Sequence, residues 1–289
     1  MRSVPAQRSS SRPGLDIPLG GTAPCETSAM WTVAGWNIQF IRLQANQSTA
    51  IDQSRGTVHL KVVTGALDRP ASTPFGAPGS LRTIAVDAAE VTAGPAGAVL
   101  TVMTETPEVP DNLHNMEQLT FTGPDSDAFE WESFFDRFGG AEVFAGVDAH
   151  IVPGFHLLDR DGSEMVYVHF WTMGKDGDAS THNHGRAPSV GAPAFAETHF
   201  VLNNGTGLGG MYQCAEPGAP RTTLVMQRGE EHGPLWTVDP ATGMPARRPN
   251  GAVEYGWHGW KAGTDDTNAQ AFDFVAAFEI NPDLACVER

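Results

Sequence analysis

Residues 181–212, THNHGRAPSVGAPAFAETHFVLNNGTGLGGMY, constrain the fold of this chain more than any other stretch. His182 and His184 are two positions apart, so in an extended strand both side chains leave the same face of the sheet. Farther along, Glu197 opens an alternating run that places it on one strand face together with His199. Imidazoles and a carboxylate that converge from adjacent strands predict a site for a divalent transition metal.

Short apolar runs separated by turn residues make up most of the remaining chain. The 32 glycines and 21 prolines separate these runs as turn residues, which is typical of an all-β protein. A strand that begins at residue 57 is expected to end at Gly65, and Gly94-Pro95 is expected to separate two strands. The expected strands cover residues 31–43 (as a pair), 57–63, 81–86, 98–103, 165–171 and 272–280.

Two segments near the middle of the chain differ from this pattern. Residues 104–115 are polar and interrupted by proline, which predicts a linker or a long edge segment. Residues 125–138 open with capping candidates and carry several phenylalanines, so a short helix is expected there. We expect this helix to pack against the β-structure, and a substrate lid is the alternative.

The balance of charge limits the class of partner. A formal net charge of -16 argues against nucleic acid and anionic membranes, which require clustered Lys and Arg. Three cysteines without close spacing, and the lack of an apolar run of membrane-spanning length, predict a soluble cytoplasmic protein. Residues 1–17 are expected to form a disordered arm.

The histidine pair, Glu197 and the run 200–205 follow one another in the order of the first cupin motif, and in this respect the chain resembles the cupin family. The connection between His184 and Glu197 is longer than in that family, so either the hairpin carries an insertion or His199 takes part of the role of the glutamate. The second cupin motif brings one histidine from a later strand, and His232 is the candidate. The resemblance implies a metal held by His182, His184, Glu197 and His232, with His199 as the alternative to His232.

The resemblance also implies a bicupin, with two β-barrel (jelly-roll) domains and a short helical linker. Residues 18–115 would form a degenerate, metal-free cupin domain, because no H-x-H pair precedes the strand that carries His59. A lone histidine on a strand is more often structural than a ligand. Residues 116–140 would form the helical linker and residues 141–289 the metal-binding cupin domain.

Three further segments, 168–171, 231–234 and 257–263, resemble the cupin portion of the fungal aldos-2-ulose dehydratases. Those enzymes dehydrate and isomerise keto-sugars such as anhydrofructose, with zinc in the cupin, and they also carry a large propeller domain. The resemblance implies a lyase or isomerase, in particular a dehydratase, for a keto-sugar or a similar polyhydroxylated carbonyl compound. It implies zinc as the cofactor, with iron, manganese or nickel as alternatives.

Such a reaction needs a base that accepts a proton from a carbon next to the carbonyl group. His199 is the first candidate for a catalytic base, and Glu231, His169 and Tyr167 are the alternatives. The run 165–171 alternates strictly, but the sequence leaves open which of its two faces lines the barrel. The residues expected to contact the substrate are His156, Trp171, Trp257 and Lys261.

Two other functions stay open at this point. A redox-active iron or another redox metal in the same site would make the protein a cupin dioxygenase or oxidase. A non-catalytic sugar-binding or storage cupin is the third interpretation. Because cupins often pair through sheet edges, we expect a homodimer.

Overall fold

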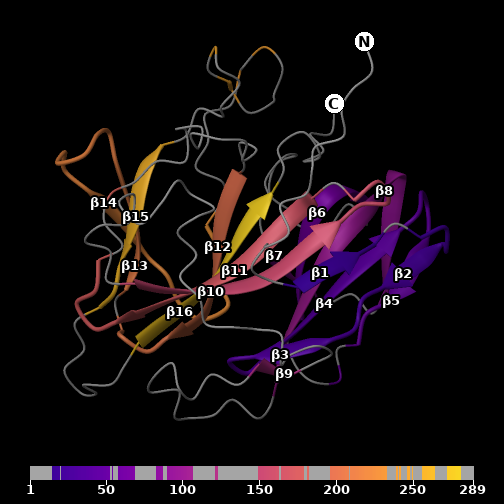
Figure 1. The fold of residues 1–289 in the computed structure, drawn as a ribbon, viewed down its shortest axis with the longest axis horizontal. Helices are drawn as coiled ribbons and strands as arrows, with labels where there is room; N and C mark the ends of the chain where they lie inside the picture. The colour runs from indigo at the N-terminus through magenta and orange to yellow at the C-terminus, as the bar shows by residue number, and fades with distance from the viewer. Residues whose placement is uncertain are drawn as a thin grey trace.

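The fold is known from a computed structural model (Figure 1). Every regular element in its described part is a β-strand, which confirms the all-β prediction. Within that part, no helix is long and apolar enough to cross a membrane. The structure describes residues 15–19, 21–52, 54, 58–68, 83–86, 90–106, 121–122, 149–162, 164–178, 181, 196–207, 209–232, 239, 241, 246–247, 249, 256–263 and 272–280.

An antiparallel sheet of eight strands, which we call the first sheet, occupies the right-hand side of Figure 1. Its strand order is β7-β6-β8-β4-β3-β9, while β2 pairs with β4 and β5 with β8. Positive φ angles at Ala34 and Gly35 form the tight turn of the β3-β4 hairpin. The strands are β2 (Cys25–Thr27), β3 (Trp31–Val33), β4 (Trp36–Leu43), β5 (Ser48–Ala50), β6 (Val58–Asp68), β7 (Thr83–Val86), β8 (Glu90–Glu105) and β9 (Phe121–Thr122).

Two expected turns of the first sheet are continuous strands instead. β6 runs through Gly65, and β8 runs through Gly94-Pro95 without a break. Gly65 and Gly97 both have positive φ, and a Cβ at Gly65 would lie 2.0 Å from the carbonyl oxygen of Gly97. The pairing of β6 with β8 shifts register beside Gly65. Glycine therefore bends these strands at bulges, where the sequence predicted that they end.

Four strands of the second half of the chain, together with β1 near the N-terminus, form a sheet of five strands, which we call the second sheet, with the order β1-β10-β11-β16-β12. Only β1 is parallel to its neighbour, β10, and it includes residues 15–17, which the sequence assigned to a disordered arm. A three-stranded sheet in the order β14-β13-β15, the small sheet, lies at the left of Figure 1. The strands are β1 (Leu15–Pro18), β10 (Ala149–Leu158), β11 (Glu164–Gly174), β12 (Ala196–Asn204), β13 (Gly210–Cys214), β14 (Thr222–Val225), β15 (Trp257–Lys261) and β16 (Phe272–Ile280).

Buried apolar side chains form three clusters in the described part of the chain. The interface cluster joins the first sheet to the second and includes Trp36, Phe40 and Phe200. The aliphatic cluster lies on the other side of the first sheet and includes Leu60. The inner cluster lies between the second sheet and the small sheet and includes Val201. The second sheet is therefore covered on both faces.

Part of the predicted domain organisation lies outside the described residues. This applies to the helix at 125–138 and to most of the linker at 116–140. Within that linker, residues 121–122 form β9 and pair with β3 of the first sheet. The boundaries of the two cupin domains stay a prediction.

Candidate functional site

The alternation of β12 sends the side chains of neighbouring residues to opposite faces of the second sheet. Val201 belongs to the inner cluster, whereas Phe200 and Leu202 belong to the interface cluster. Glu197 and His199 share the face of Val201 and therefore point toward the small sheet. Both are buried, with 1% and 8% of their surface exposed.

The same reasoning decides which face of β11 is the inner one. Val166, Val168 and Phe170 contribute to the interface cluster, so the alternate residues face the small sheet. Those residues are Tyr167, His169 and Trp171, all buried. The structure thus settles an orientation that the sequence left open.

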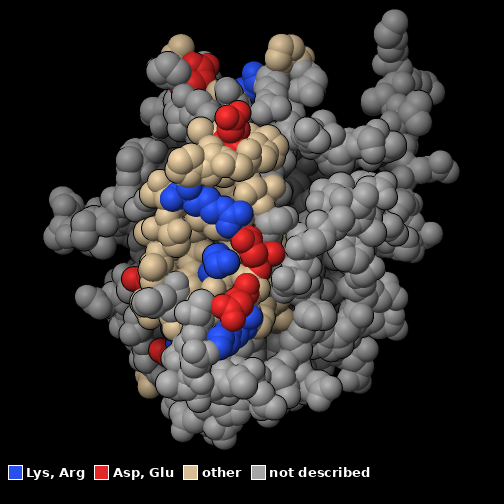
Figure 2. All heavy atoms as spheres, turned by 90° about the vertical axis from the view of Figure 1, so that its left-hand side faces the viewer, with Lys and Arg blue, Asp and Glu red and all other residues tan. Residues whose placement is uncertain are grey.

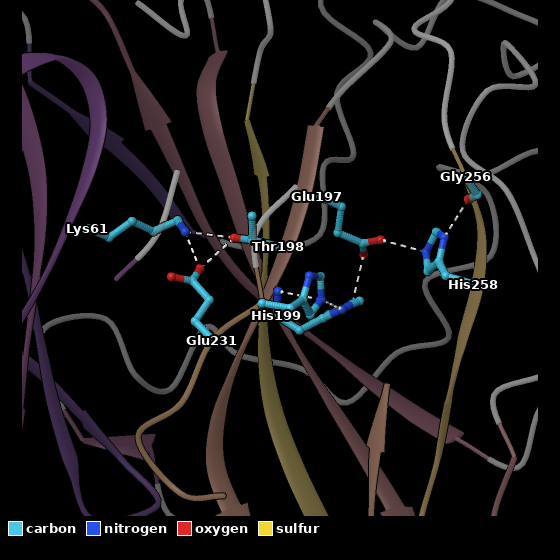
Figure 3. Close-up of polar contacts among 8 residues, drawn as sticks. Lys61, Glu197, Thr198, His199, Glu231, Gly256 and His258 are labelled. Carbon is cyan, nitrogen blue, oxygen red and sulfur yellow. Dashed lines mark hydrogen bonds and ion pairs between the residues drawn. The ribbon is translucent and has the colours of Figure 1, made fainter. Parts of the chain in front are cut away.

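Glu197 lies at the centre of the polar group on this inner face (Figure 3). Its Oε1 is 3.3 Å from Nε2 of His199, and its Oε2 is 3.5 Å from Nε2 of His258. His258 comes from β15 of the small sheet and is fully buried. A carboxylate from one sheet is therefore flanked by one imidazole from each sheet. We call Glu197, His199, His232 and His258 the inner polar group.

The ring of His258 has a defined orientation. Its Nδ1 lies 2.9 Å from the carbonyl oxygen of Gly256, which can only accept a hydrogen bond, so Nδ1–H is the donor. In the neutral ring the proton is then on Nδ1, and Nε2 faces Glu197 without one. A histidine held by a backbone carbonyl in this way is typical of metal ligands and of catalytic imidazoles.

His232 fixes the proton of His199 in a similar manner. The backbone N–H of His199 donates to Nε2 of His232 over 3.2 Å, so this nitrogen is an acceptor. Nδ1 of His199 lies 2.6 Å from the same Nε2 and must therefore carry the proton between them. In the neutral ring of His199, Nε2 is then the basic nitrogen, and it is the one that faces Glu197.

A row of aromatic rings extends from the inner polar group along the second sheet. The rings of His156 and Tyr167 stack at 4.2 Å between centroids, and His169 follows Tyr167 at 5.3 Å. Trp171 lies 5.9 Å from His169 and 6.5 Å from His199. Four residues predicted from the sequence, His156, Tyr167, His169 and Trp171, are thereby brought to one face with His199.

Other predicted residues lie elsewhere. β15 turns His258 and Trp260 inward, so Trp257 and the exposed Lys261 lie on the opposite face of the small sheet. Glu231 contacts Lys61 and Thr198 on the side of β12 that faces the first sheet, away from Glu197. His182 and His184 lie outside the described residues.

Sequence reasoning missed two residues, His258 and Lys61. The alternation of His258 with Trp260, a large apolar residue, is the signal that could have placed His258 inward. Lys61 interrupts the apolar run of β6, and its even spacing with Val63 could have marked it as buried.

The donor chemistry of the inner polar group fits a divalent cation, because a buried carboxylate flanked by two imidazoles favours positive charge. The described residues alone contain no group of three or more His, Cys, Asp or Glu side chains arranged to hold a metal ion. A complete metal shell therefore needs ligands from the rest of the chain, such as His182 and His184.

The outer face of the small sheet carries mixed charge. Figure 2 shows basic and acidic side chains next to one another on this face. Arg221 pairs with Asp178 over 2.7 Å and covers the ring of Tyr212 at 4.0 Å. Burial raises the pKa of Tyr212 to about 12; Asp178 acts in the same direction, and Thr181 and Arg221 act against it.

Comparison with known proteins gives a family match over most of the chain. Residues 20–281 match the aldos-2-ulose dehydratase/isomerase (AUDH) cupin domain. Aldos-2-ulose dehydratase from Phanerodontia chrysosporium is 32% identical over 266 residues, which are 83% of this chain. The match covers 28% of that relative, so the chain corresponds to a minor part of its length.

The solved structures to which the chain shows similarity are more distant. An IolB-like protein from Salmonella typhimurium is 11% identical with a TM-score of 0.35, covering 86% of this chain and 84% of its own. Oxalate decarboxylase from Lactobacillus farciminis is 8% identical with a TM-score of 0.31, covering 88% and 78% of the two chains. Similarity at this level gives no information on activity.

Proposed function

This chain belongs to the family of aldos-2-ulose dehydratase/isomerase cupin domains, and from that membership we propose that it is a metal-dependent dehydratase or isomerase of a keto-sugar. The relative that it resembles is named for dehydration of an aldos-2-ulose. One observation in the structure carries the proposal: Glu197 is buried between His199 and His258, and His232 fixes the proton of His199.

Dehydration of a keto-sugar requires two proton transfers. A proton leaves the carbon next to the carbonyl group, and the hydroxyl group on the following carbon then leaves as water after taking up a proton. The C–H electron pair becomes the new carbon–carbon double bond as the C–O bond breaks. One group that accepts the first proton and returns it to the leaving oxygen satisfies both requirements.

We assign the base to Nε2 of His199. Hydrogen bonding to His232 keeps the ring proton on Nδ1, so Nε2 is the nitrogen that can accept a proton. Oε1 of Glu197, 3.3 Å away, stabilises the resulting imidazolium. Trp171 and Trp260, with ring centroids 6.5 and 6.4 Å from His199, limit the access of water to this nitrogen.

The cofactor that we propose is zinc, with iron, manganese or nickel as alternatives. Glu197 and the predicted ligands His182 and His184 would hold it. Because His232 lies against Nδ1 of His199, we assign to His232 the role of setting the tautomer of His199 in place of the role of metal ligand. A bound divalent cation supplies a Lewis acid that makes the proton next to a carbonyl group more acidic. Trp171, on the inner face beside His169 and His199, is the ring that we propose to pack against the C–H face of a sugar.

Turnover of anhydrofructose by the purified protein tests the proposal. We expect formation of an unsaturated product, its loss after treatment with a chelator, and its return on addition of zinc. His199→Gln should lower kcat by about 10²- to 10⁴-fold, because a positioned base contributes roughly that factor. Thr223→Ala, on the exposed strand β14, is the matched control and should keep full turnover.

Other outcomes would reject the proposal in favour of a named alternative. Consumption of oxygen with substrate by an iron-containing protein would identify an oxygenase. Sugar binding without turnover, unaffected by His182→Ala and by removal of metal, would identify a binding protein. Zinc-replete protein that leaves aldos-2-uloses unchanged would contradict the proposed activity.

A further inference from the structure

A lysine from the first sheet is buried against the second half of the chain. Lys61 on β6 has 0% of its surface exposed and points, like Val63, toward the interface cluster. Burial lowers the pKa of this ammonium group, and the carboxylate of Glu231 acts in the opposite direction. A buried ammonium persists only where several groups satisfy it, so its partners define its role.

The partners of Lys61 come from two separate segments of the second half (Figure 3). Its Nζ donates a hydrogen bond to Oγ1 of Thr198 over 2.7 Å and another to Oε1 of Glu231. The hydroxyl group of Thr198 donates in turn to Oε1 of Glu231 over 2.6 Å, which closes a ring of three contacts. The ring of Phe278 also lies 4.8 Å from Nζ, as a cation–π contact.

Both partners are direct chain neighbours of the inner polar group. Thr198 lies between Glu197 and His199, and Glu231 precedes His232. Successive side chains of an extended segment point to opposite sides. Lys61 therefore contacts these two segments on the face opposite to the one that carries Glu197, His199 and His232. Those three residues are members of the inner polar group.

The second of these segments leaves a turn at residues 227–230 and runs along the edge of β12. The N–H of Gly229 donates to the carbonyl oxygen of Val201 over 2.8 Å, and the N–H of Val201 donates to that of Glu230 over 2.9 Å. Glu231 forms an isolated bridge with Phe200. These bonds set the path of the backbone, and the ion pair with Lys61 fixes the side chain next to His232.

We propose that Lys61 is a positioning residue for this site: by holding Thr198 to Glu231, it keeps Nδ1 of His199 at 2.6 Å from Nε2 of His232 and thereby sets the tautomer of His199. The first half of the chain thus contributes to the site through a contact that never reaches the substrate. The effect on turnover rests on the function proposed above. The effect on the tautomer does not, and the two can be measured separately.

The double variant Lys61→Met, Glu231→Gln tests this role, because it removes both charges and leaves no buried charge unpaired. With 15N-labelled histidine, long-range 15N–1H spectra report which ring nitrogen carries the proton, and His199→Gln and His232→Gln assign the signals. The wild-type protein should show His199 protonated at Nδ1. The double variant should show exchange between both tautomers, and its kcat should fall about 10- to 100-fold with a smaller change in KM.

Thr198→Val is a second test, for the case in which the double variant does not unfold cooperatively. It removes the hydroxyl group that contacts Lys61 and Glu231 and hardly changes the volume of the side chain. Asp159→Asn is the matched control, because it breaks the 2.6 Å Arg42–Asp159 ion pair between the two halves but touches no neighbour of the inner polar group. It should change neither the tautomer nor kcat.

Each outcome decides the proposal. An unchanged tautomer in both the double variant and Thr198→Val would overturn it, as would an equal loss in Asp159→Asn. A wild-type protein without turnover would reject the proposed function, and the tautomer measurement would still decide the role of Lys61.

Discussion

The two halves of the molecule fill their interiors differently. The aliphatic cluster of the first sheet contains side chains such as Ile41, Leu60 and Leu100. The space between the second sheet and the small sheet contains Glu197 and His258 beside apolar residues of the inner cluster. One sheet thus encloses a filled apolar interior, and the other encloses buried groups that can bind and transfer protons.

The difference indicates that the aliphatic cluster stabilises the fold, whereas the inner polar group lowers its stability. Burial of aliphatic side chains stabilises a fold by about 25 cal/mol per Å² of apolar surface, whereas buried polar groups cost desolvation. Residues that are needed for a reaction are rarely the best choice for stability. Substitutions in the aliphatic cluster should therefore change stability with little change in activity, and substitutions in the inner polar group should do the reverse.

The largest effect is expected for Glu197→Gln. This change keeps the volume of the side chain but removes the charge next to His199 and His258, so turnover should fall by about 10²- to 10⁴-fold. The midpoint of urea unfolding should change little or rise. Steady-state kinetics and equilibrium unfolding measure the two quantities, and a variant that loses stability but keeps turnover would break the comparison.

Leu60→Ala is the counterpart in the first half. Leu60 is fully buried in the aliphatic cluster, so the cavity should lower the free energy of unfolding by about 2–5 kcal/mol. At a temperature where the variant is folded, kcat should equal that of the wild type. A matching loss of kcat would show that the two interiors are coupled more tightly than the contacts indicate.

A smaller effect is expected for substitution of His59, whose ring contacts Trp36 and Phe200 of the interface cluster. Burial lowers its pKa below the ordinary 6.5, while Glu105 and Glu231 raise it. The unfolded chain therefore binds the proton more readily, and stability should fall as the pH drops below 6.5. His59→Phe should remove this part of the pH dependence. Chemical unfolding at pH 5 and pH 8 measures it, and an unchanged difference between the two pH values would exclude His59 as its source.

The smallest effect is expected for Asp159→Asn, at the partly exposed edge between the halves. Burial raises the pKa of Asp159, but hydrogen bonds from Arg42 and from the backbone of Arg160 lower it below the ordinary 3.8. The stabilising contribution is therefore present above pH 3.8 and lost as the pH falls through the lower folded-state value. The substitution should cost about 0.2–1 kcal/mol at pH 7 and less at pH 2. Thermal unfolding at both pH values checks it, and a larger cost at pH 2 would contradict the assignment.

The sequence predicted the strands more reliably than their ends. Alternation identified β6 and β11, and an apolar run identified β16 as a buried strand. Gly65 and Gly94 were expected at turns, but both lie inside continuous strands. Gly65 has a positive φ, which serves a bulge as well as a turn, and only pairing with a neighbour distinguishes the two. The inward face of β11 was undecided because both of its faces are apolar.

The site could be predicted only in part for a similar reason. Glu197 and His199 are two positions apart on one strand, so local alternation was enough to pair them. His258 reaches the same carboxylate from β15, and Lys61 reaches Thr198 from β6, through contacts between residues far apart in the chain. Such contacts depend on how the sheets pack. His182 and His184 lie outside the described residues, and their role stays a prediction.

The parallel pairing of β1 with β10 has a consequence for any attempt to divide the protein. A fragment that lacks only residues 1–20 would leave the backbone amides and carbonyls of β10 without the neighbour that Leu15–Pro18 provides. An open strand of this kind recruits strands from other molecules, so the fragment should self-associate. A synthetic peptide of residues 13–20 added in trans should occupy that position and keep the fragment monomeric.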